Sequence, residues 1–238
     1  MKIVLFAALS LLSASVLAAD TGKLKTEKQK TSYALGRQVG EDVKRNNVDL
    51  DPDVFTQAIR ESLKGQKSKM TDEEIKTTLQ GFQQKMREKQ MAMVQELSSK
   101  NKKEGEAYLE ANKKKPDVKT TASGLQYRVI KEGTGKKPGP DDVVVAHYVG
   151  THVNGKEFDS SVKRGGKPAT FAVSGVIKGW QEALQMMPEG SKWEIVVPAA
   201  LGYGERGAGG AIGPNETLVF NVELLQVKPG EKTESNKN

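Results

Sequence analysis

Residues 176–187 read VIKGWQEALQMM, and Gly179 to Met187 within this stretch is the one clear helical segment in the second half of the 238-residue chain. On either side of it, apolar and polar residues alternate as they do in a β-strand. This alternation predicts strands at 125–130, 143–149, 192–197 and 217–227, and the glycines between them mark turns. We therefore expect an α+β module of about 110 residues, an antiparallel sheet with one short helix.

The first half of the chain has the period of helices and few strand signals. Leu35, Val39 and Val43 recur every four positions, which predicts a helix with one apolar stripe. Gly36 and Gly40 lie beside this stripe and would allow another backbone to approach closely, because glycine has no Cβ atom. The alternative interpretation is that these glycines only loosen the helix.

Two further helices are predicted before residue 116. One opens at Asp51-Pro52, where a capping residue precedes a proline in the first turn. The other opens at Thr71, with Glu74 three residues later as in a capping box, and runs to about Asn112. Its apolar residues become sparse after Leu97. We therefore expect its first half to pack and its second half to be a solvated stalk.

A helical set with a single apolar face buries little surface by itself. Self-association through that face would complete a core, and methionines are adaptable residues for such an interface. The sequence therefore predicts a homodimer. A monomeric helical cap is the alternative.

The composition excludes several kinds of chemistry. The chain has no cysteine and only two histidines, His147 and His152, so thiolate catalysis and His-rich metal sites are not expected. We expect neither a metal nor a cofactor, and we expect both histidines to be structural or solvent-facing. The net charge of +7 comes from lysines interspersed with glutamates, without a basic and aromatic motif, so no nucleic-acid partner is expected.

The first residues have the pattern of a secretory signal peptide. Lys2 precedes a short apolar run, and small residues follow up to Ala18. The run is too short for a transmembrane segment, which needs about 20 residues; a short N-terminal core helix is the alternative. We predict an exported protein in the periplasm of a Gram-negative bacterium, with the outer membrane or cell surface as the alternative location.

Five of the aromatic residues on the β module are candidates for a common pocket, in a chain that has only 5% aromatic residues. This concentration suggests a ligand-binding concavity, although ordinary core packing is the alternative. A turn at Asn154-Gly155 predicts a hairpin whose second strand leads into Phe158. The glycine-rich loop at 201–214 is of the kind that carries function. The five aromatic residues are Tyr148, Phe158, Trp180, Tyr203 and Phe220.

The order of short motifs in this half resembles that of the FKBP-type (tacrolimus-binding) peptidyl-prolyl isomerases. The motifs are AHYVG at 146–150, GKEFDSS at 155–161, VIKGW at 176–180, LGYG at 201–204 and IGPNETLVF at 212–220. The resemblance implies a half-barrel, an antiparallel sheet wrapped around one short helix.

The helical half is similar to the macrophage infectivity potentiator (Mip) class of the same family. The residues that carry this similarity are Ser32-Tyr33 with Gly36, GEAYL at 105–109 and ASGLQY at 122–127. Together the resemblances imply an order of segments along the chain: a signal peptide at 1–18, a helical dimerisation domain at 19–70, a long connecting helix at 71–115, an isomerase domain at 116–228 and a disordered tail at 229–238.

The resemblance also implies a site. Trp180 would form the floor of a pocket, and the backbone N–H of Ile212 would meet a substrate carbonyl. Asp159 would act electrostatically rather than as a general base. The implied catalytic residues are Asp159, Tyr203 and Phe158, and the implied substrate-binding residues are Tyr148, Val176, Ile177, Trp180, Ile212 and Phe220.

Two departures from the family pattern concern the apolar walls. Pro168 is followed by Ala169 where many members have an aromatic residue, and the segment 208–211 has no bulky side chain. These departures are expected to affect affinity and sequence preference more than activity.

The resemblance implies a peptidyl-prolyl cis-trans isomerase that assists the folding of exported proteins, with chaperone activity. Its partners would be unfolded or partly folded proteins that contain proline, and macrolides of the FKBP type would inhibit it. The alternatives are a non-catalytic dimeric chaperone or binding module and a surface factor associated with virulence.

Overall fold

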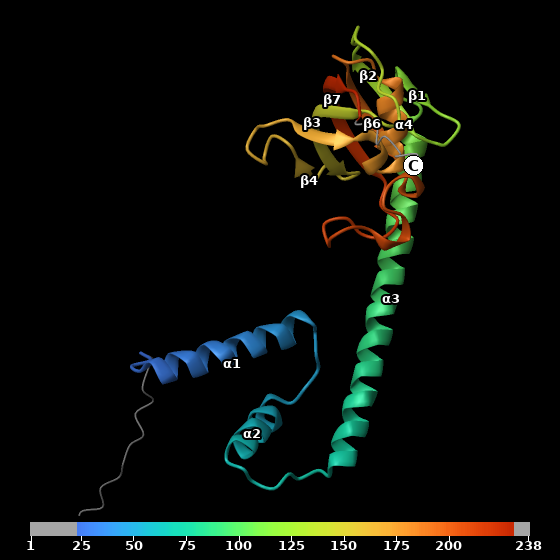
Figure 1. The fold of residues 1–238 in the computed structure, drawn as a ribbon. Helices are drawn as coiled ribbons and strands as arrows, with labels where there is room; N and C mark the ends of the chain where they lie inside the picture. Colours follow the sequence, from blue (N-terminus) through green and yellow to red (C-terminus); the bar gives the residue numbers. More distant parts are fainter. Residues whose placement is uncertain (1–22, 231–238) are drawn as a thin grey trace, which may run out of the picture. The chain divides into compact units, whose positions relative to one another are not determined.

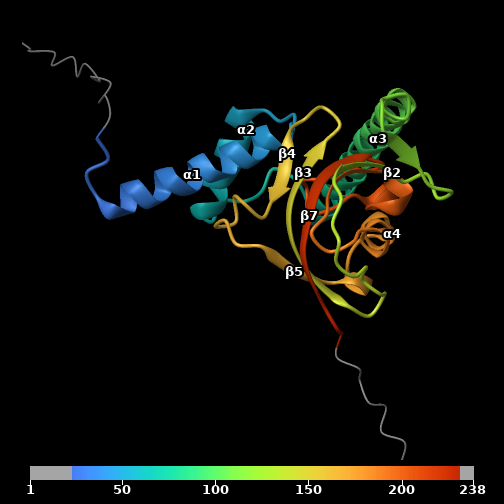
Figure 2. The same cartoon turned by 90° about the horizontal axis from the view of Figure 1, so that it is seen from above.

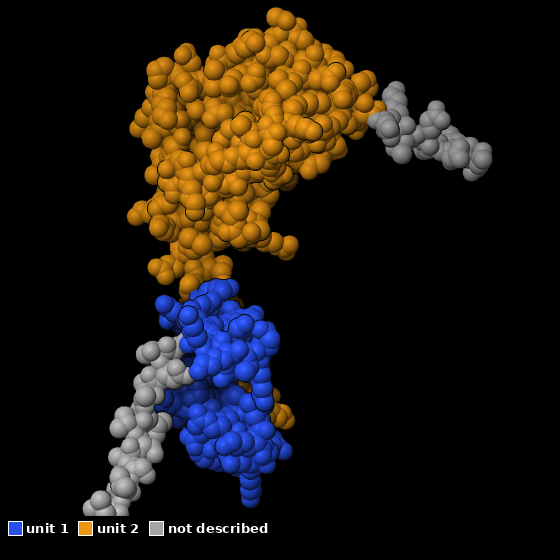
Figure 3. All heavy atoms as spheres, turned by 90° about the vertical axis from the view of Figure 1, so that its left-hand side faces the viewer, with its two compact units in different colours: residues 1–74 blue, residues 75–238 orange. Residues whose placement is uncertain are grey.

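The computed structural model describes residues 23–230, and the chain divides into two compact units, 1–74 and 75–238 (Figure 3). The signal peptide expected at 1–18 and residues 231–238 of the expected tail lie outside the described residues. None of the helices between residues 23 and 230 is long and apolar enough to cross a membrane.

The first unit holds the helices α1 (Glu27–Arg45) and α2 (Pro52–Leu63). Both begin at residues whose side chains accept hydrogen bonds from free backbone N–H groups: Thr26 caps α1, and Asp51 caps α2 ahead of the proline. Neither helix has a buried residue within the single chain. Local capping therefore defines where these helices begin, while their apolar faces stay exposed.

The long helix α3 (Asp72–Asn112) begins at the predicted capping box. The Glu74 backbone N–H donates to Thr71 Oγ1 at 3.2 Å, and the Thr71 N–H donates to a Glu74 carboxylate oxygen at 2.7 Å. These hydrogen bonds hold the pKa of the Glu74 carboxyl below its usual range. This confirms the predicted helix start.

The expectation that the second half of α3 is a solvated stalk is wrong. The buried residues of α3 are Asn101, Gly105 and Asn112, all in that half. The Asn101 amide donates to the Pro214 carbonyl at 2.8 Å, and the Asn112 amide donates to Gln126 Oε1 at 2.9 Å. This contact surface is built from small and polar residues, so a search for an apolar stripe could not find it.

The second unit also holds a single antiparallel sheet with the order β1-β2-β6-β7-β3-β4, and β5 pairs with β3 (Figure 1). The four predicted strands are present as β2, β3, β6 and β7; the short strands β1 and β5 were not predicted. The bounds are β1 Val118–Thr120, β2 Gln126–Lys131, β3 Val143–His152, β4 Glu157–Ser160, β5 Ala169–Ala172, β6 Lys192–Val197 and β7 Leu218–Lys228.

The sheet curves around the helix α4 (Lys178–Met186), as Figure 2 shows. Trp180, Ala183 and Leu184 are the buried side chains on the inner face of α4. They pack with inward-facing strand residues such as Ile195 and Leu224, which are fully buried. The α+β half-barrel is therefore held together by one helix face against the concave side of the sheet.

We predict opposite effects of alanine at two glycines of α3. A Cβ atom at Gly105 would overlap the Thr217 hydroxyl, whereas at Gly81 no described residue beyond the helix's own backbone lies within 4 Å of such an atom. Gly105→Ala should lower the free energy of unfolding of the β module by about 1–3 kcal/mol through overpacking.

Gly81→Ala is the matched control. It should leave the β module unchanged while increasing helix stability by up to about 1 kcal/mol. Urea unfolding followed by tryptophan fluorescence checks both variants, because Trp180 and Trp193 both lie in the β module. Equal effects of the two variants would contradict the docking of α3.

Candidate active site

A cavity of about 280 Å³ opens between α4, the strands β3, β4, β5 and β7, and the loop after β6. Eight of the nine candidate residues line it; Ile212 does not. Phe171 and Gly175, which the sequence did not suggest, also line it. The lining residues are Tyr148, Phe158, Asp159, Phe171, Gly175, Val176, Ile177, Trp180, Tyr203 and Phe220.

Trp180 lies at the centre of the aromatic lining. Its ring makes edge contacts with Tyr148, Phe171 and Phe220, with centroids 5.6, 5.7 and 5.4 Å apart. Such pairs contribute about 0.5–1.5 kcal/mol each beyond the area that they bury. The rings therefore hold one another in place, and the aromatic wall of the cavity is already formed in the free protein.

The rings of Phe158 and Phe220 can meet because Gly150 lies beneath them. They form an edge-to-face pair with centroids 5.7 Å apart, and a Cβ atom at Gly150 would overlap both rings. Gly150 follows Tyr148 by two positions on β3, so both residues face the same side of the sheet. Strand β3 thus contributes the Tyr148 side chain to the cavity and, at Gly150, the space that the two phenylalanine rings occupy.

Asp159 has a fully occupied carboxylate. One oxygen accepts hydrogen bonds from the Ser160 N–H and from Arg164 Nε, both at 2.9 Å. The other oxygen accepts from the Tyr148 hydroxyl at 2.7 Å and from Arg164 Nη2 at 2.9 Å. Because these donors already use both oxygens, the carboxylate is arranged to position its neighbours. Arg164, in the turn after β4, was not among the residues that the sequence suggested for the site.

Tyr148 is a hydrogen-bond donor over the whole physiological range. Burial of its hydroxyl, followed by the hydrogen bond to Asp159, raises the pKa of Tyr148 to about 12. The proton on the phenol oxygen is therefore retained and points at Asp159. This bond ties β3 to the end of β4, where Phe158 and Asp159 lie side by side.

Ile212 is not placed as expected. Its side chain belongs to the buried core, and its N–H donates to the Ala208 carbonyl at 3.0 Å, within a two-way bridge that closes the glycine-rich loop. That N–H is therefore already used. Among the described residues, the N–H of Ile177 has no hydrogen-bond acceptor, and Ile177 lines the cavity just before α4 begins.

The two histidines differ in their surroundings. His147 lies on the opposite face of β3 from Tyr148, with Nδ1 3.1 Å from Ser161 Oγ. The expectation that His152 faces solvent is wrong: its Nδ1 lies 2.7 Å from Glu216 Oε2, and only 14% of its side chain is exposed. Glu216 is 64 residues away in sequence, so nothing local to His152 indicated the pair.

The loop that carries Tyr203 is held by α3, against which it lies in Figure 1. The Asn215 N–H donates to the carbonyl of Gly204, the next residue after Tyr203, at 2.8 Å. The Asn215 side-chain amide in turn donates to Ser98 Oγ on α3 at 2.8 Å. One wall of the cavity is therefore positioned by the long helix as well as by the sheet.

Comparison with known proteins matches two successive parts of the chain to family domains. Residues 28–129 match the domain amino terminal to FKBP-type peptidyl-prolyl isomerase, and residues 134–225 match the FKBP-type peptidyl-prolyl cis-trans isomerase domain. The outer membrane protein MIP of Legionella longbeachae is 45% identical over 96% of this chain and 98% of its own. The peptidyl-prolyl cis-trans isomerase Mip of Coxiella burnetii is 44% identical over 86% of this chain and 89% of its own.

A solved structure supports the same assignment. The crystal structure of FkpA from Escherichia coli matches with a TM-score of 0.69 and 39% sequence identity, over 86% of this chain and 98% of that one. An enzyme class is thereby defined, that of the peptidyl-prolyl cis-trans isomerases. The chain belongs to the FKBP-type family of these enzymes, and its helical half places it beside the Mip and FkpA relatives.

We predict that Tyr148→Phe changes the response to alkaline pH. In the wild type the folded state keeps the Tyr148 proton to about pH 12, whereas an unfolded tyrosine loses it near pH 10. Between these values the unfolded state binds fewer protons, so Tyr148 makes stability fall as pH rises. The variant lacks this contribution.

Ultraviolet titration of the folded proteins should show one phenol fewer near pH 12 in the variant. Urea unfolding at pH 9 should show a loss of about 1–3 kcal/mol, because the hydrogen bond to Asp159 is gone. A difference titration centred near pH 10 would contradict the placement of this hydroxyl.

Proposed function

We propose that the aromatic cavity binds a proline residue of an unfolded or partly folded polypeptide and speeds rotation about the peptide bond before it. The observation that carries this proposal is the apolar cavity around Trp180, with the backbone N–H of Ile177 at its edge and without an acceptor among the described residues. A cavity of about 280 Å³ can hold a proline ring with its neighbouring carbonyl group.

The reaction requires no bond to be broken. Rotation about a peptide bond has a barrier of about 18–20 kcal/mol because it interrupts amide resonance. The twisted amide has less charge separation than the planar one, so an apolar cavity disfavours the planar ground state relative to the transition state. Catalysis follows if the cavity binds the twisted form more strongly than either planar isomer.

The polar groups at the edge of the cavity have separate roles in this proposal. The Ile177 N–H donates to the substrate carbonyl before proline, and the Tyr203 hydroxyl supplies a second donor from the loop. Fixed donors of this kind stabilise the twisted carbonyl without reorganisation. Asp159 holds the Tyr148 hydroxyl and Arg164 in place and removes no proton, since four donors already occupy its oxygens.

We predict that Phe158→Ala lowers kcat/KM for a short proline peptide about 10- to 100-fold, the effect of losing about 1.5–3 kcal/mol of apolar contact. Tyr203→Phe and Asp159→Ala should each give a smaller loss. A protease-free isomerisation assay by nuclear magnetic resonance measures these rates, and a macrolide of the FKBP type should compete with the peptide.

Leu225→Ala is the control, because Leu225 is an exposed apolar residue outside the cavity. Circular dichroism establishes that each variant is folded. Wild-type rates in all three cavity variants would refute the site assignment.

We also propose that the helical half forms a homodimer, which holds clients in two cavities at once. The support is a set of large apolar residues that stay exposed in the single chain, although their spacing is that of helix faces. Within residues 23–230, and apart from the helix's own backbone, nothing lies within 4 Å of a Cβ atom at Gly36 or Gly40, which leaves room there for another backbone. The exposed residues are Leu35, Val39, Val54, Phe55, Ile59, Leu79, Phe82, Met91, Met93, Val94 and Leu97.

When a client is bound in the cavity of one protomer, the linked cavity of the other protomer is present at a high effective concentration for that client. This arrangement favours assistance to folding proteins over action on isolated peptides alone. With the signal-peptide pattern at residues 1–18, it supports folding assistance to exported proteins in the periplasm, with the outer membrane or cell surface as the alternative. A non-catalytic clamp remains the competing function, and peptide isomerisation separates the two.

We predict that Val39→Asp converts the protein to a monomer in analytical ultracentrifugation, because a carboxylate would be buried in an apolar interface. The rate for a short proline peptide should stay within about twofold of wild type, since Val39 lies in the other unit from the cavity. Suppression of client aggregation should fall.

Lys30→Asp is the control for this variant: Lys30 is exposed on the same helix, outside the apolar set. It should leave the dimer intact. A Val39→Asp protein that sediments as the wild type does would contradict this interface.

A further inference from the structure

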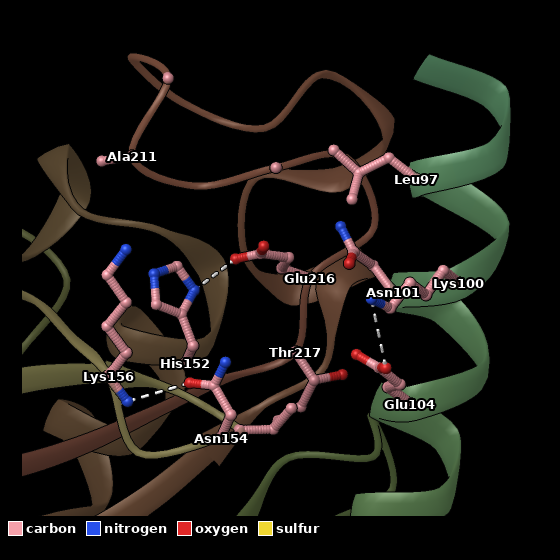
Figure 4. A pocket seen from close by; sticks show the side chains of 13 residues that line it. Leu97, Lys100, Asn101, Glu104, His152, Asn154, Lys156, Ala211, Glu216 and Thr217 are labelled. Carbon is pink, nitrogen blue, oxygen red and sulfur yellow. Dashed lines mark hydrogen bonds and ion pairs between the residues drawn. The ribbon is translucent and has the colours of Figure 1, made fainter. Parts of the chain in front are cut away.

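A second cavity, of about 310 Å³, lies where the docked part of α3 meets the β module (Figure 4). One wall comes from α3, one from the hairpin between β3 and β4, and one from the glycine-rich loop before β7. Unlike the aromatic cavity it is polar, and neither the family resemblance nor the proposed reaction assigns it a role. Its side chains include Lys100, Asn101, Glu104, His152, Lys156 and Glu216.

This cavity is held in shape by buried polar contacts. Asn101, only 8% exposed, donates to the Pro214 carbonyl, and Glu216 lies 2.7 Å from His152. Gly213 packs so closely on Asn101 that a Cβ atom there would press on the amide nitrogen. The three walls are therefore joined by specific contacts, and the hollow between them is part of the folded unit.

The polar cavity and the aromatic cavity are neighbours. The ring of His152, which lines the polar cavity, contacts the ring of Phe158, which lines the aromatic one, with centroids 5.2 Å apart. The loop after β6 borders both, because Tyr203 lines the aromatic cavity while Ala211 lines the polar one. A polypeptide with proline in the aromatic cavity can continue over this shared wall.

The charges in the polar cavity are unequally paired. A Glu104 carboxylate oxygen lies 4.0 Å from Lys100 Nζ, and a Glu216 carboxylate oxygen is within hydrogen-bond distance of His152 Nδ1. Lys156 forms no ion pair among the residues that the structure describes, and its side chain points toward the loop at Ala211 in Figure 4. Both carboxylates thus have partners, and one ammonium group remains available.

We propose that the polar cavity is a second subsite for the client polypeptide, in which Lys156 binds an acidic side chain a few residues from the proline. This inference rests on the proposed function, since the client is the one whose proline occupies the aromatic cavity. An extended chain advances about 3.3–3.6 Å per residue, so the positions three to six residues from proline sample about 10–20 Å of chain. The long helix then contributes directly to client selection.

The experiment compares peptides of two lengths on the full-length protein. A four-residue proline peptide fills only the aromatic cavity, whereas peptides of about 12 residues reach the polar one. Each longer peptide carries one variable residue, which is glutamate, glutamine or lysine. Separate peptides place this residue at each position from three to six residues before or after the proline. Isomerisation is measured by exchange spectroscopy at low and high salt.

The wild type should favour the glutamate peptide over the glutamine peptide at one of these positions. Lys156→Ala should lower kcat/KM for that peptide about two- to fivefold, the range of an exposed ion pair, with no change for the four-residue peptide. Lys156→Glu should reverse the preference in favour of lysine. Added salt should weaken the wild-type preference.

Lys131→Ala is the matched control, because it removes one exposed positive charge outside both cavities. It should change none of these rates. Equal rates for the three longer peptides at every position, or equal losses from Lys156→Ala and Lys131→Ala, would overturn the proposal. Failure of the wild type to act on the four-residue peptide would instead overturn the proposed function, so the two outcomes are distinguishable.

Discussion

The packing of Trp180 between α4 and the concave side of the sheet is the contact on which the fold and the site both depend. Its ring is 4% exposed and meets three other aromatic rings edge to face. The same side chain belongs to the hydrophobic core and lines the cavity. A rigid cavity is therefore a consequence of how the half-barrel buries its helix.

The long helix α3 adds a second constraint. Its last three turns are docked on the β module through Asn101, Gly105 and Asn112, and its hydrogen bond to Asn215 reaches the loop of Tyr203. Most of the large apolar residues between Leu79 and Leu97 stay exposed in the single chain. One helix thus positions a wall of the cavity at one end and presents exposed apolar side chains toward the other.

Much of this arrangement was predictable from local pattern. The capping box at Thr71, the helix after Ile177 and the strand at 192–197 were predicted because capping and periodicity are properties of neighbouring residues. The concentration of aromatic residues on the β module also suggested a ligand-binding concavity, with ordinary core packing as the alternative. The docking of α3 was missed, since Asn101 and Gly105 are not apolar and only their fit to distant residues buries them.

The sequence by itself determined the fold class, the order of the helices and of the longer strands, and all the aromatic side chains that line the cavity except Phe171. Tertiary structure alone decided that the Ile177 N–H is unpaired while that of Ile212 is used, that Arg164 and Tyr148 occupy the Asp159 carboxylate, and that His152 pairs with Glu216. Periodicity belongs to neighbours along the chain. A hydrogen bond between residues 64 or 113 positions apart depends on how whole segments pack, and that packing is set by the fold.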